Sequence, residues 1–317
     1  MTESQPCVVQ VVWSLGYGGL ERMVLDLAVG LRPLGWRVEV VALTNQVPLA
    51  EAFTAAGVPV QVEPQHGLDY RLPRRLARLF RRLGADLVHA HNYGRYLYAG
   101  PAARLARLPS LYTEHSNTRP AERALWHTQR LISRQAGGVV AVSETVRQGL
   151  VQQQGLPAEL VRVIPNGVDL ERFAGGDRAR LRRELGVTSD DLVIGHVGRL
   201  VPVKNQRLLL AAFAQVVAEQ PRSWLVLAGD GELRGELEQQ AAALGIAPRV
   251  RFLGRRDDLP DILAGLDLFC LSSNSEGLPL AILEAMAAGR AVVATQAAGG
   301  DLVVPGQTGA LTPTGDA

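Results

Sequence analysis

One stretch of the chain shows the pattern that decides the fold: Leu268-Phe269-Cys270-Leu271-Ser272-Ser273-Asn274-Ser275-Glu276-Gly277-Leu278-Pro279-Leu280-Ala281-Ile282-Leu283-Glu284-Ala285-Met286. It begins with an apolar run of strand length, and a polar loop follows. Proline is favoured in the first turn of a helix, so Pro279 predicts a helix over Leu280–Ala288. The stretch therefore predicts a buried strand whose carboxyl end leads through a loop into a helix.

The same alternation of strand-length apolar runs and helical stretches extends along the whole chain. It is typical of parallel sheets covered by helices, so we predict the α/β class. The turn-forming sequence Pro165-Asn166-Gly167 ends the first series of strands and helices. We therefore predict two doubly wound, Rossmann-like domains, over residues 1–167 and 168–317. In such sheets ligands bind beyond the carboxyl ends of the strands.

The predicted strands are Cys7–Trp13, Arg37–Leu43, Val58–Val62, Leu87–Ala90, Ser110–Thr113, Gly138–Val142, Val161–Ile164, Leu192–Val197, Trp224–Ala228, Val250–Leu253, Leu268–Leu271 and Ala291–Thr295. The predicted helices are Leu20–Leu31, Leu72–Leu83, Glu144–Gln154, Asn205–Glu219, Glu232–Leu244, Asp258–Ala264 and Leu280–Ala288.

The composition is that of a globular protein, because 47% of the 317 residues are hydrophobic and 20% are charged. The net charge of +2 gives no reason to expect nucleic acid as a partner. No apolar run approaches the roughly 18 residues of a membrane span, and Met1–Pro6 lack the pattern of a secretion signal. The two cysteines, Cys7 and Cys270, lie in apolar runs, which favours a reducing compartment. We therefore expect a cytoplasmic protein.

Gly18 and Gly19 stand between the first predicted strand and its helix. Glycine lets the backbone approach a ligand closely, and the amides at a helix start favour anions. The spacing departs from Gly-x-Gly-x-x-Gly and no acid follows the second strand, so a dinucleotide site is weakly supported. A tight strand-to-helix turn explains these glycines as well as a ligand loop does.

Arg199 and Lys204 follow the predicted strand Leu192–Val197 and precede a helix. A guanidinium and an ammonium at this spacing beside a helix start suit a diphosphate. Solvated surface charges are the alternative. Lys204 is the only lysine among 33 basic residues, and this favours the phosphate role.

Glu276 and Glu284 are the two acids of the opening stretch. Glu276 lies in the loop, and Glu284 lies about one turn inside a helix of mostly Ala, Leu, Ile and Met. A carboxylate in so apolar a helix is costly unless a partner satisfies it, and ligand hydroxyls would do so. A helix-dipole acid explains Glu276 taken alone, whereas the pair favours a ligand site.

These motifs together resemble a known family. The Glu-x7-Glu spacing is similar to the signature of retaining glycosyltransferases of the GT-B fold, and nearly the whole chain resembles family 4 of that class. The other matching motifs, in the family's order, are Gly18-Gly19-Leu20-Glu21, His115, Val142-Ser143-Glu144, Pro165-Asn166-Gly167-Val168-Asp169, Gly198-Arg199 with Lys204, and Gly229-Asp230-Gly231. The resemblance implies a GT-B architecture, in which an acceptor-side domain (1–167) and a nucleotide-sugar-binding domain (168–317) face a cleft.

The resemblance also implies how the donor diphosphate is bound. Arg199 and Lys204 would hold it and stabilise the leaving nucleotide as charge develops. The backbone of Leu278, Pro279 and Leu280 would lie near the phosphates.

Further implied roles concern the sugar and the nucleoside. Glu284 would accept hydrogen bonds from the ribose hydroxyls, and Glu276 would contact the hydroxyls of the transferred sugar. Gly18 and Gly19 would line the cleft beside the diphosphate. His115 would reach the donor sugar from the other domain and help to organise the reacting centre.

His115 follows the predicted strand Ser110–Thr113, at the end where site residues belong. His89, His91 and His196 also lie near strand ends, so position alone does not single out His115. His89 and His91 would share a strand face and could hold a metal ion with His115, but no cysteine or carboxylate completes that set. We predict an enzyme without a metal or other cofactor.

One predicted helix carries an arginine-rich face. Opposite its leucines lie Arg71, Arg74, Arg75, Arg78, Arg81 and Arg82. Such a face could dock on an anionic membrane, the inner face of the plasma membrane in this case, where related enzymes meet lipid-linked acceptors. A solvated face of a helix packed on the sheet is the alternative.

The predicted function is transfer of a sugar from a nucleotide sugar, UDP- or GDP-linked, to a glycan or lipid-linked acceptor, with retention. Bacterial cell-surface polysaccharide synthesis is the expected setting. One alternative is a nucleotide-sugar 2-epimerase on the same fold, which needs no acceptor. Another is a non-catalytic subunit that binds nucleotide sugar or glycan. Thr312–Ala317 has the pattern of a turn before a further helix, so we expect a chain truncated at its C-terminus, without its final helices.

Overall fold

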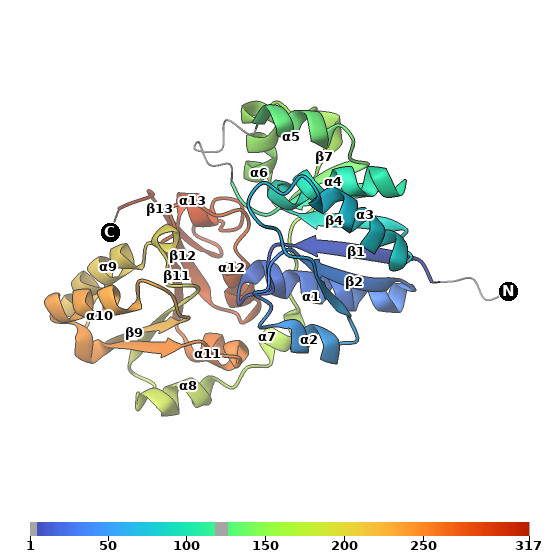
Figure 1. The fold of residues 1–317 in the computed structure, drawn as a ribbon. Helices are drawn as coiled ribbons and strands as arrows, with labels where there is room; N and C mark the ends of the chain where they lie inside the picture. Colours follow the sequence, from blue (N-terminus) through green and yellow to red (C-terminus); the bar gives the residue numbers. More distant parts are fainter. Residues whose placement is uncertain (1–4, 118–125, 317) are drawn as a thin grey trace. The chain divides into compact units, whose positions relative to one another are not determined.

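The computed structural model describes residues 5–117 and 126–316. Met1–Ser4 of the segment Met1–Pro6 and Ala317 of the segment Thr312–Ala317 lie outside the described residues. The chain divides into two compact units, unit 1 (Met1–Asn166) and unit 2 (Gly167–Ala317). Each unit is built on one parallel sheet with helices against it (Figure 1). The predicted α/β class with two Rossmann-like domains is confirmed.

Unit 1 contains a seven-stranded sheet in the order β3-β2-β1-β4-β5-β6-β7. The order changes direction between β1 and β4, so the chain winds outward from that point to both sides. Ligands bind at such switch points in open α/β sheets. The strands are β1 (Cys7–Val12), β2 (Arg37–Ala42), β3 (Val60–Val62), β4 (Leu87–His91), β5 (Ser110–Glu114), β6 (Gly138–Ala141) and β7 (Val161–Val163).

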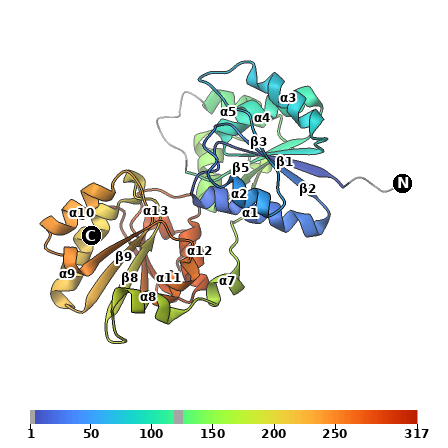
Figure 2. The ribbon, with the colours of Figure 1, turned by 60° about the horizontal axis from the view of Figure 1, so that its bottom comes forward.

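Helices cover both faces of this sheet. On one face lie α1 (Gly19–Leu31) and α2 (Ala50–Ala55), and on the other lie α3 (Leu72–Arg82), α4 (Tyr93–Ala106) and α5 (Trp126–Ser133), as Figures 1 and 2 show. A short helix, α6 (Glu144–Gln148), continues into a π-helical turn over Gly149–Gln153. Every residue of β1 is buried, because both faces of the strand pack against helices.

Unit 2 contains a six-stranded sheet in the order β10-β9-β8-β11-β12-β13. Its chain also reverses direction at one point, between β8 and β11. These two strands are neighbours in the sheet, so the loops that follow them meet at one edge. The strands are β8 (Leu192–Val197), β9 (Ser223–Ala228), β10 (Val250–Gly254), β11 (Leu268–Leu271), β12 (Ala291–Thr295) and β13 (Gly309–Thr312).

Successive residues of the unit 2 strands pack into two separate hydrophobic clusters. Val193 joins one cluster with Leu181 and Ile282, whereas Ile194 joins the other with Leu210. This alternation follows from the two-residue period of a strand. The helices that cover the sheet are α7 (Leu170–Ala174), α8 (Arg178–Leu185), α9 (Gln206–Glu219), α10 (Arg234–Ala243), α11 (Leu259–Gly265), α12 (Leu280–Ala287) and α13 (Gln296–Gly299) (Figure 2).

Within the described residues, six helices lie outside the predicted ranges: α2, α4, α5, α7, α8 and α13. The helix α4 is buried on most sides and has no polar face, and it contains Pro101, so its sequence lacks a helical signal. The helix α8 begins in the polar, Gly- and Arg-rich segment 174–183, whose sequence has no helical pattern of apolar residues. Its Arg182 is buried and donates to the Asp191 carbonyl at 2.7 Å, and Gly186 ends it in the left-handed conformation.

None of the helices within residues 5–117 and 126–316 combines the length and the apolar character needed to cross a bilayer.

Candidate functional site

In unit 2 the loop after β8 is held against the loop after β9. The amide of Gly198 donates to the Ala228 carbonyl at 2.9 Å, and the amide of Leu200 donates to the Asp230 carbonyl at 3.0 Å. Arg199 stands between these two anchored residues, and its side chain is exposed. A fixed backbone therefore presents this guanidinium at the carboxyl edge of the sheet.

The loop after β11 is joined to the same loop by several hydrogen bonds. The amide of Asn274 donates to the Val203 carbonyl at 2.8 Å. The buried Ser272 hydroxyl lies 3.0 Å from the Lys204 carbonyl and 2.9 Å from the Asn205 carbonyl. The chain turns sharply at Asn205, which is left-handed with a φ of 48°. These contacts fix the backbone of Lys204, the only lysine of the chain.

Lys204 and Glu276 form a direct ion pair. The distance from Nζ of Lys204 to Oε1 of Glu276 is 2.6 Å, and 18% and 14% of their side chains are exposed. A pair this far removed from water is held by geometry and by neighbouring polar groups, since desolvation offsets much of the attraction. Two residues predicted to bind the donor are thus brought into contact across 72 positions of sequence.

The other predicted residues of unit 2 follow the same strand, β11. Leu278 and Pro279 are buried, and Leu280 begins α12 directly after Pro279. Glu284 is half-buried in that helix. The structure therefore places every predicted donor-binding residue of this unit in the segments that follow the neighbouring strands β8 and β11.

A buried pair of polar side chains beneath this loop was not anticipated. His196 on β8 donates from Nδ1 to the Cys270 carbonyl at 3.1 Å, so its Nε2 accepts from the Gln206 amide nitrogen, also at 3.1 Å. Gln206 also donates to the Arg199 carbonyl at 2.8 Å. Burial first, and then the charge of Lys204, lower the pKa of His196 to about 4, which keeps the ring neutral. The sequence signal for His196 was a polar residue inside the apolar run of β8, whereas Gln206, between Asn205 and Arg207, carries no such signal.

In unit 1 the predicted glycines lie at the carboxyl edge of the sheet. Gly18 is the N-cap of α1 and Gly19 is its first residue. Gly18 has an extended backbone, and a Cβ added to it would lie 2.5 Å from a carboxylate oxygen of Glu21. The free amides at the start of a helix favour an anion, so this position suits a phosphate or a carboxylate.

The turn after β4 is held in an unusual conformation beside His115. Asn92 has φ 68° and ψ 148°, a region that side-chain-bearing residues rarely adopt. Its side-chain oxygen accepts from the His115 amide at 2.8 Å, and its own amide donates to the Thr113 carbonyl at 2.7 Å. The ends of β4 and β5 are thus locked together, which fixes the backbone of His115.

Three histidines gather at these strand ends. Nδ1 of His91 lies 3.0 Å from Nε2 of His115, and Nε2 of His89 lies 2.8 Å from the Thr113 hydroxyl. Burial lowers the pKa of His89 to about 4 and that of His115 to about 3. In the part of the chain that the structure describes, no three or more His, Cys, Asp or Glu side chains are grouped so as to hold a metal ion.

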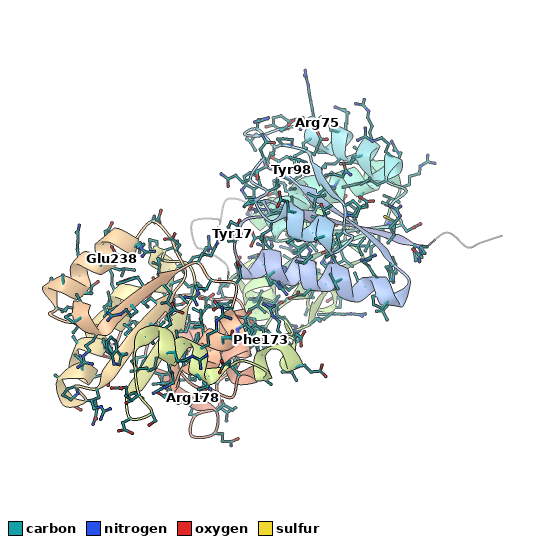
Figure 3. All side chains as sticks on the ribbon, turned by 90° about the horizontal axis from the view of Figure 1, so that it is seen from below. Tyr17, Arg75, Tyr98, Phe173, Arg178 and Glu238 are labelled. Carbon is teal, nitrogen blue, oxygen red and sulfur yellow. The ribbon has the colours of Figure 1, made fainter. Side chains whose placement is uncertain are left out.

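The arginine face of α3 is smaller than the sequence suggests. Arg75 is not directed outward: its guanidinium donates to Glu63 at 2.6 Å and to Asp69 at 2.8 Å. The Arg75 guanidinium also donates to the Pro64 carbonyl at 2.7 Å. Figure 3 labels Arg75, together with Tyr98, in unit 1. Arg75 therefore belongs to a structural ion pair and is not part of the exposed arginine face. The exposed arginines are Arg71, Arg74, Arg78, Arg81 and Arg82.

Family models match both units. The model described as Glycosyltransferase Family 4 matches residues 17–172, and the model described as Glycosyl transferases group 1 matches residues 191–317.

Individual proteins match over most of the chain. EpsF of Bacillus subtilis (strain 168), which carries the name of a glycosyltransferase, is 31% identical over 91% of this chain and 79% of its own. The D-inositol 3-phosphate glycosyltransferase of Rhodococcus jostii is 32% identical over 93% of this chain and 73% of its own. The UDP-Gal:alpha-D-GlcNAc-diphosphoundecaprenol alpha-1,3-galactosyltransferase of Escherichia coli is 31% identical over 72% and 62%.

A solved structure resembles the whole chain. HepE of Anabaena in complex with UDP-glucose superposes with a TM-score of 0.87 at 30% identity, covering 98% of this chain and 86% of its own.

Proposed function

This chain belongs to glycosyltransferase family 4, and from that premise we propose that it moves a sugar from a nucleotide-sugar donor to a glycan or lipid-linked acceptor, with retention of the anomeric configuration. The observation that carries the proposal is the Lys204–Glu276 ion pair, which joins the loops that follow β8 and β11, the strands that also lead to Arg199 and to α12. The setting we propose is bacterial cell-surface polysaccharide synthesis in the cytoplasm.

The chemistry we assign to unit 2 is donor binding. Arg199 and Lys204 hold the diphosphate, whose negative charge grows as the sugar departs, so their stabilisation is greatest in the transition state. Glu276 contacts hydroxyls of the transferred sugar and Glu284 accepts from the ribose. Because Glu276 pairs with Lys204, it also keeps the ammonium extended toward the loop after β11.

The roles we assign to unit 1 concern the diphosphate and the donor sugar. Gly18 and Gly19 offer backbone amides to the diphosphate, and His115 contacts the donor sugar. Retention here is proposed to proceed by attack of the acceptor hydroxyl on the face from which the nucleotide leaves, with the leaving phosphate taking the proton. Glu276 then acts as a positioning group, and no covalent sugar–enzyme bond forms.

The first test is calorimetric titration with UDP, GDP and ADP in EDTA, on wild type and on Lys204→Ala. One nucleotide is expected to bind without metal, and UDP is the expected one because HepE was solved with UDP-glucose. Loss of one charge-assisted phosphate contact costs about 1.5–3 kcal/mol, so Lys204→Ala is expected to weaken binding by roughly ten- to over a hundredfold.

A matched control is Arg222→Ala, which removes an exposed cation that pairs with Asp190 and Asp191. Arg222 directly precedes β9, at the opposite edge of the sheet, so its loss is expected to leave nucleotide affinity unchanged. If Lys204→Ala bound the nucleotide with the wild-type affinity, Lys204 would not bind the phosphates as we propose. Conversion of the donor alone to a second nucleotide sugar would identify an epimerase instead.

The membrane contact that we propose rests on the exposed part of the arginine face. Just before Arg71 in the sequence stand two exposed apolar side chains, Leu68 at 75% and Tyr70 at 83% exposure. Apolar side chains flanked by cations are typical of proteins that lie on anionic bilayers. We therefore propose that this face brings the enzyme to a lipid-linked acceptor.

Replacement of Arg71, Arg74 and Arg78 by Gln is expected to weaken binding to phosphatidylglycerol vesicles by on the order of a hundredfold, at about 1 kcal/mol per basic residue. Flotation of the variant with vesicles measures this. The control replaces the exposed Arg183, Arg207 and Arg222 by Gln and removes the same charge elsewhere. Equal flotation of both triple variants would contradict a specific face.

A further inference from the structure

Five side chains at the centre of the unit 1 sheet share one face. In the register of the sheet Gln10 on β1 is opposite His89 on β4, and His91 is opposite Thr113 on β5. Residues two apart on a strand point to the same side, so His91 follows His89 and His115 follows Thr113 on that side. Distant segments thus deliver a glutamine and three histidines to one place.

Three of these residues form a continuous hydrogen-bonded chain. Nε2 of His91 lies 2.8 Å from the side-chain oxygen of Gln10, and Nδ1 of His91 lies 3.0 Å from Nε2 of His115. Gln10 is fully buried and His91 is 1% exposed, so water does not compete for these atoms. The chain runs from the middle of β1 to the loop where His115 stands.

The direction of this chain follows from elementary hydrogen-bond chemistry. An amide oxygen only accepts, so Nε2 of His91 must carry the proton. A neutral imidazole carries one N–H, which leaves Nδ1 of His91 as an acceptor. Burial and the neighbouring His89 and His115 lower the pKa of His91 well below 6.5, and the ring is neutral at physiological pH. Nε2 of His115 must then donate to it.

We infer that Gln10 and His91 are positioning residues that hold His115 in the tautomer protonated at Nε2, so that Nδ1 of His115 is a bare acceptor for a donor-sugar or acceptor hydroxyl. A bare nitrogen accepts from a hydroxyl but is repelled by a phosphate oxygen, which has no proton to give. His115 therefore selects a sugar hydroxyl and leaves the diphosphate to the cations of unit 2. The identity of the substrate group rests on the proposed function; the tautomer does not.

Gln10 sets the direction because its amide is the one end of the chain with distinct donor and acceptor atoms. If its nitrogen faced His91, every proton in the chain would move to the opposite ring nitrogen, and His115 would present an N–H. The two arrangements are mutually exclusive, so a measurement of either ring reports on both.

The test is long-range ¹H–¹⁵N correlation NMR on protein labelled at its six histidines, assigned by single His→Gln variants. In the wild type at pH 7.5, His91 and His115 are both expected to be protonated at Nε2 and bare at Nδ1. A proton on Nδ1 of His115, or a doubly protonated ring, would overturn the inference without any variant.

Gln10→Met removes the directing amide at similar volume, and His115 is then expected to show both tautomers. The matched control is Thr113→Val, which removes the partner of His89 but leaves the Gln10–His91–His115 chain whole, and His115 is expected to keep one tautomer. If the His115 spectrum of Gln10→Met were the same as that of the wild type, Gln10 would not control the tautomer of His115.

A transfer assay separates this inference from the proposed function. With both tautomers equally populated, the competent fraction and kcat/KM fall by about half or more, while the affinity for UDP stays at the wild-type value. If the protein shows the expected tautomers but transfers no sugar, the proposed function is contradicted and the tautomer assignment still holds.

Discussion

Between pH 7.5 and pH 5, unit 1 is expected to lose at least about 4 kcal/mol of its free energy of unfolding, against about 2 kcal/mol for unit 2. The cause is buried histidine. Burial lowers the pKa of His89 to about 4 and of His115 to about 3, and that of His91 lies well below 6.5. Unit 2 holds one comparable ring, His196, whose pKa is lowered to about 4.

The sign follows from proton binding. Well above pH 6.5 these rings are neutral in both the folded and the unfolded chain, so they add no pH dependence there. As the pH falls below 6.5 the unfolded chain binds protons that the folded chain refuses, and stability falls by about 1.4 kcal/mol per pH unit for each ring, or about 2 kcal/mol at pH 5. The loss continues until the pH reaches the folded-state pKa, near 4 for His89.

Carboxylates do not obscure this window. Hydrogen bonds from Thr188 lower the pKa of Asp191 to about 2, and the pKa of Asp258 is lowered chiefly by Arg256. Such groups stabilise the folded state above their ordinary pKa of about 4 and lose that contribution only as the pH falls below it. These two carboxylates therefore titrate below the interval from pH 6.5 to pH 5, in which the unfolded chain protonates its histidines.

Urea unfolding followed by pulse proteolysis measures the two units separately, because the mass of the surviving fragment identifies the unit that is still folded. His89→Gln removes one titrating ring and is expected to reduce the loss in unit 1 by about 2 kcal/mol. His66→Gln alters an exposed histidine and serves as the control. Equal losses in both units would contradict this account of acid sensitivity.

The strands other than β13 (Gly309–Thr312) could be predicted because parallel strands are buried on both faces and therefore appear as short apolar runs, whereas β13 is only partly buried and contains no such run. The run Cys7–Trp13 contains β1, and Leu268–Leu271 is β11 itself. The helix α4 could not be predicted in the same way. Because it is buried on most sides, no polar stripe marks it in the sequence. Its Gly100 packs closely on Tyr96, since an added Cβ would lie 2.9 Å from the ring, and this contact also leaves no local signal.

The positions of charged side chains at strand ends could be predicted, but their partners could not. Lys204 and Glu276 are each visible as charges in loops, yet their contact depends on β8 and β11 being neighbours in the sheet. Gln10 and His91 are 81 residues apart, and neither carries a local signal of its partner. Pairing across a parallel sheet is set by strand order, which short-range patterns do not contain.

Gly229→Ala is expected to lower the free energy of unfolding of unit 2 by roughly 2–5 kcal/mol, through backbone strain and overpacking together. Gly229 follows β9 with a φ of +140°, where a side chain is strained whatever the space. A Cβ there would lie 1.9 Å from the carbonyl oxygen of Gly198. The neighbouring backbone cannot yield easily, since the amide of Gly229 donates to the Gly254 carbonyl at 2.8 Å.

The carbonyl that must move belongs to the residue before Arg199, so the same substitution is expected to weaken UDP binding as well as stability. Gly235→Ala is the matched control, because Gly235 lies on α10 and an added Cβ would meet nothing within 4 Å. Alanine in a helix is favoured over glycine by about 0.5–1 kcal/mol, so this variant is expected to be slightly stabilised and to bind UDP normally. Urea unfolding and calorimetry compare the two. If Gly229→Ala behaved like Gly235→Ala, the close approach of the loops after β8 and β9 would not exist in solution, and Arg199 would lack its fixed backbone.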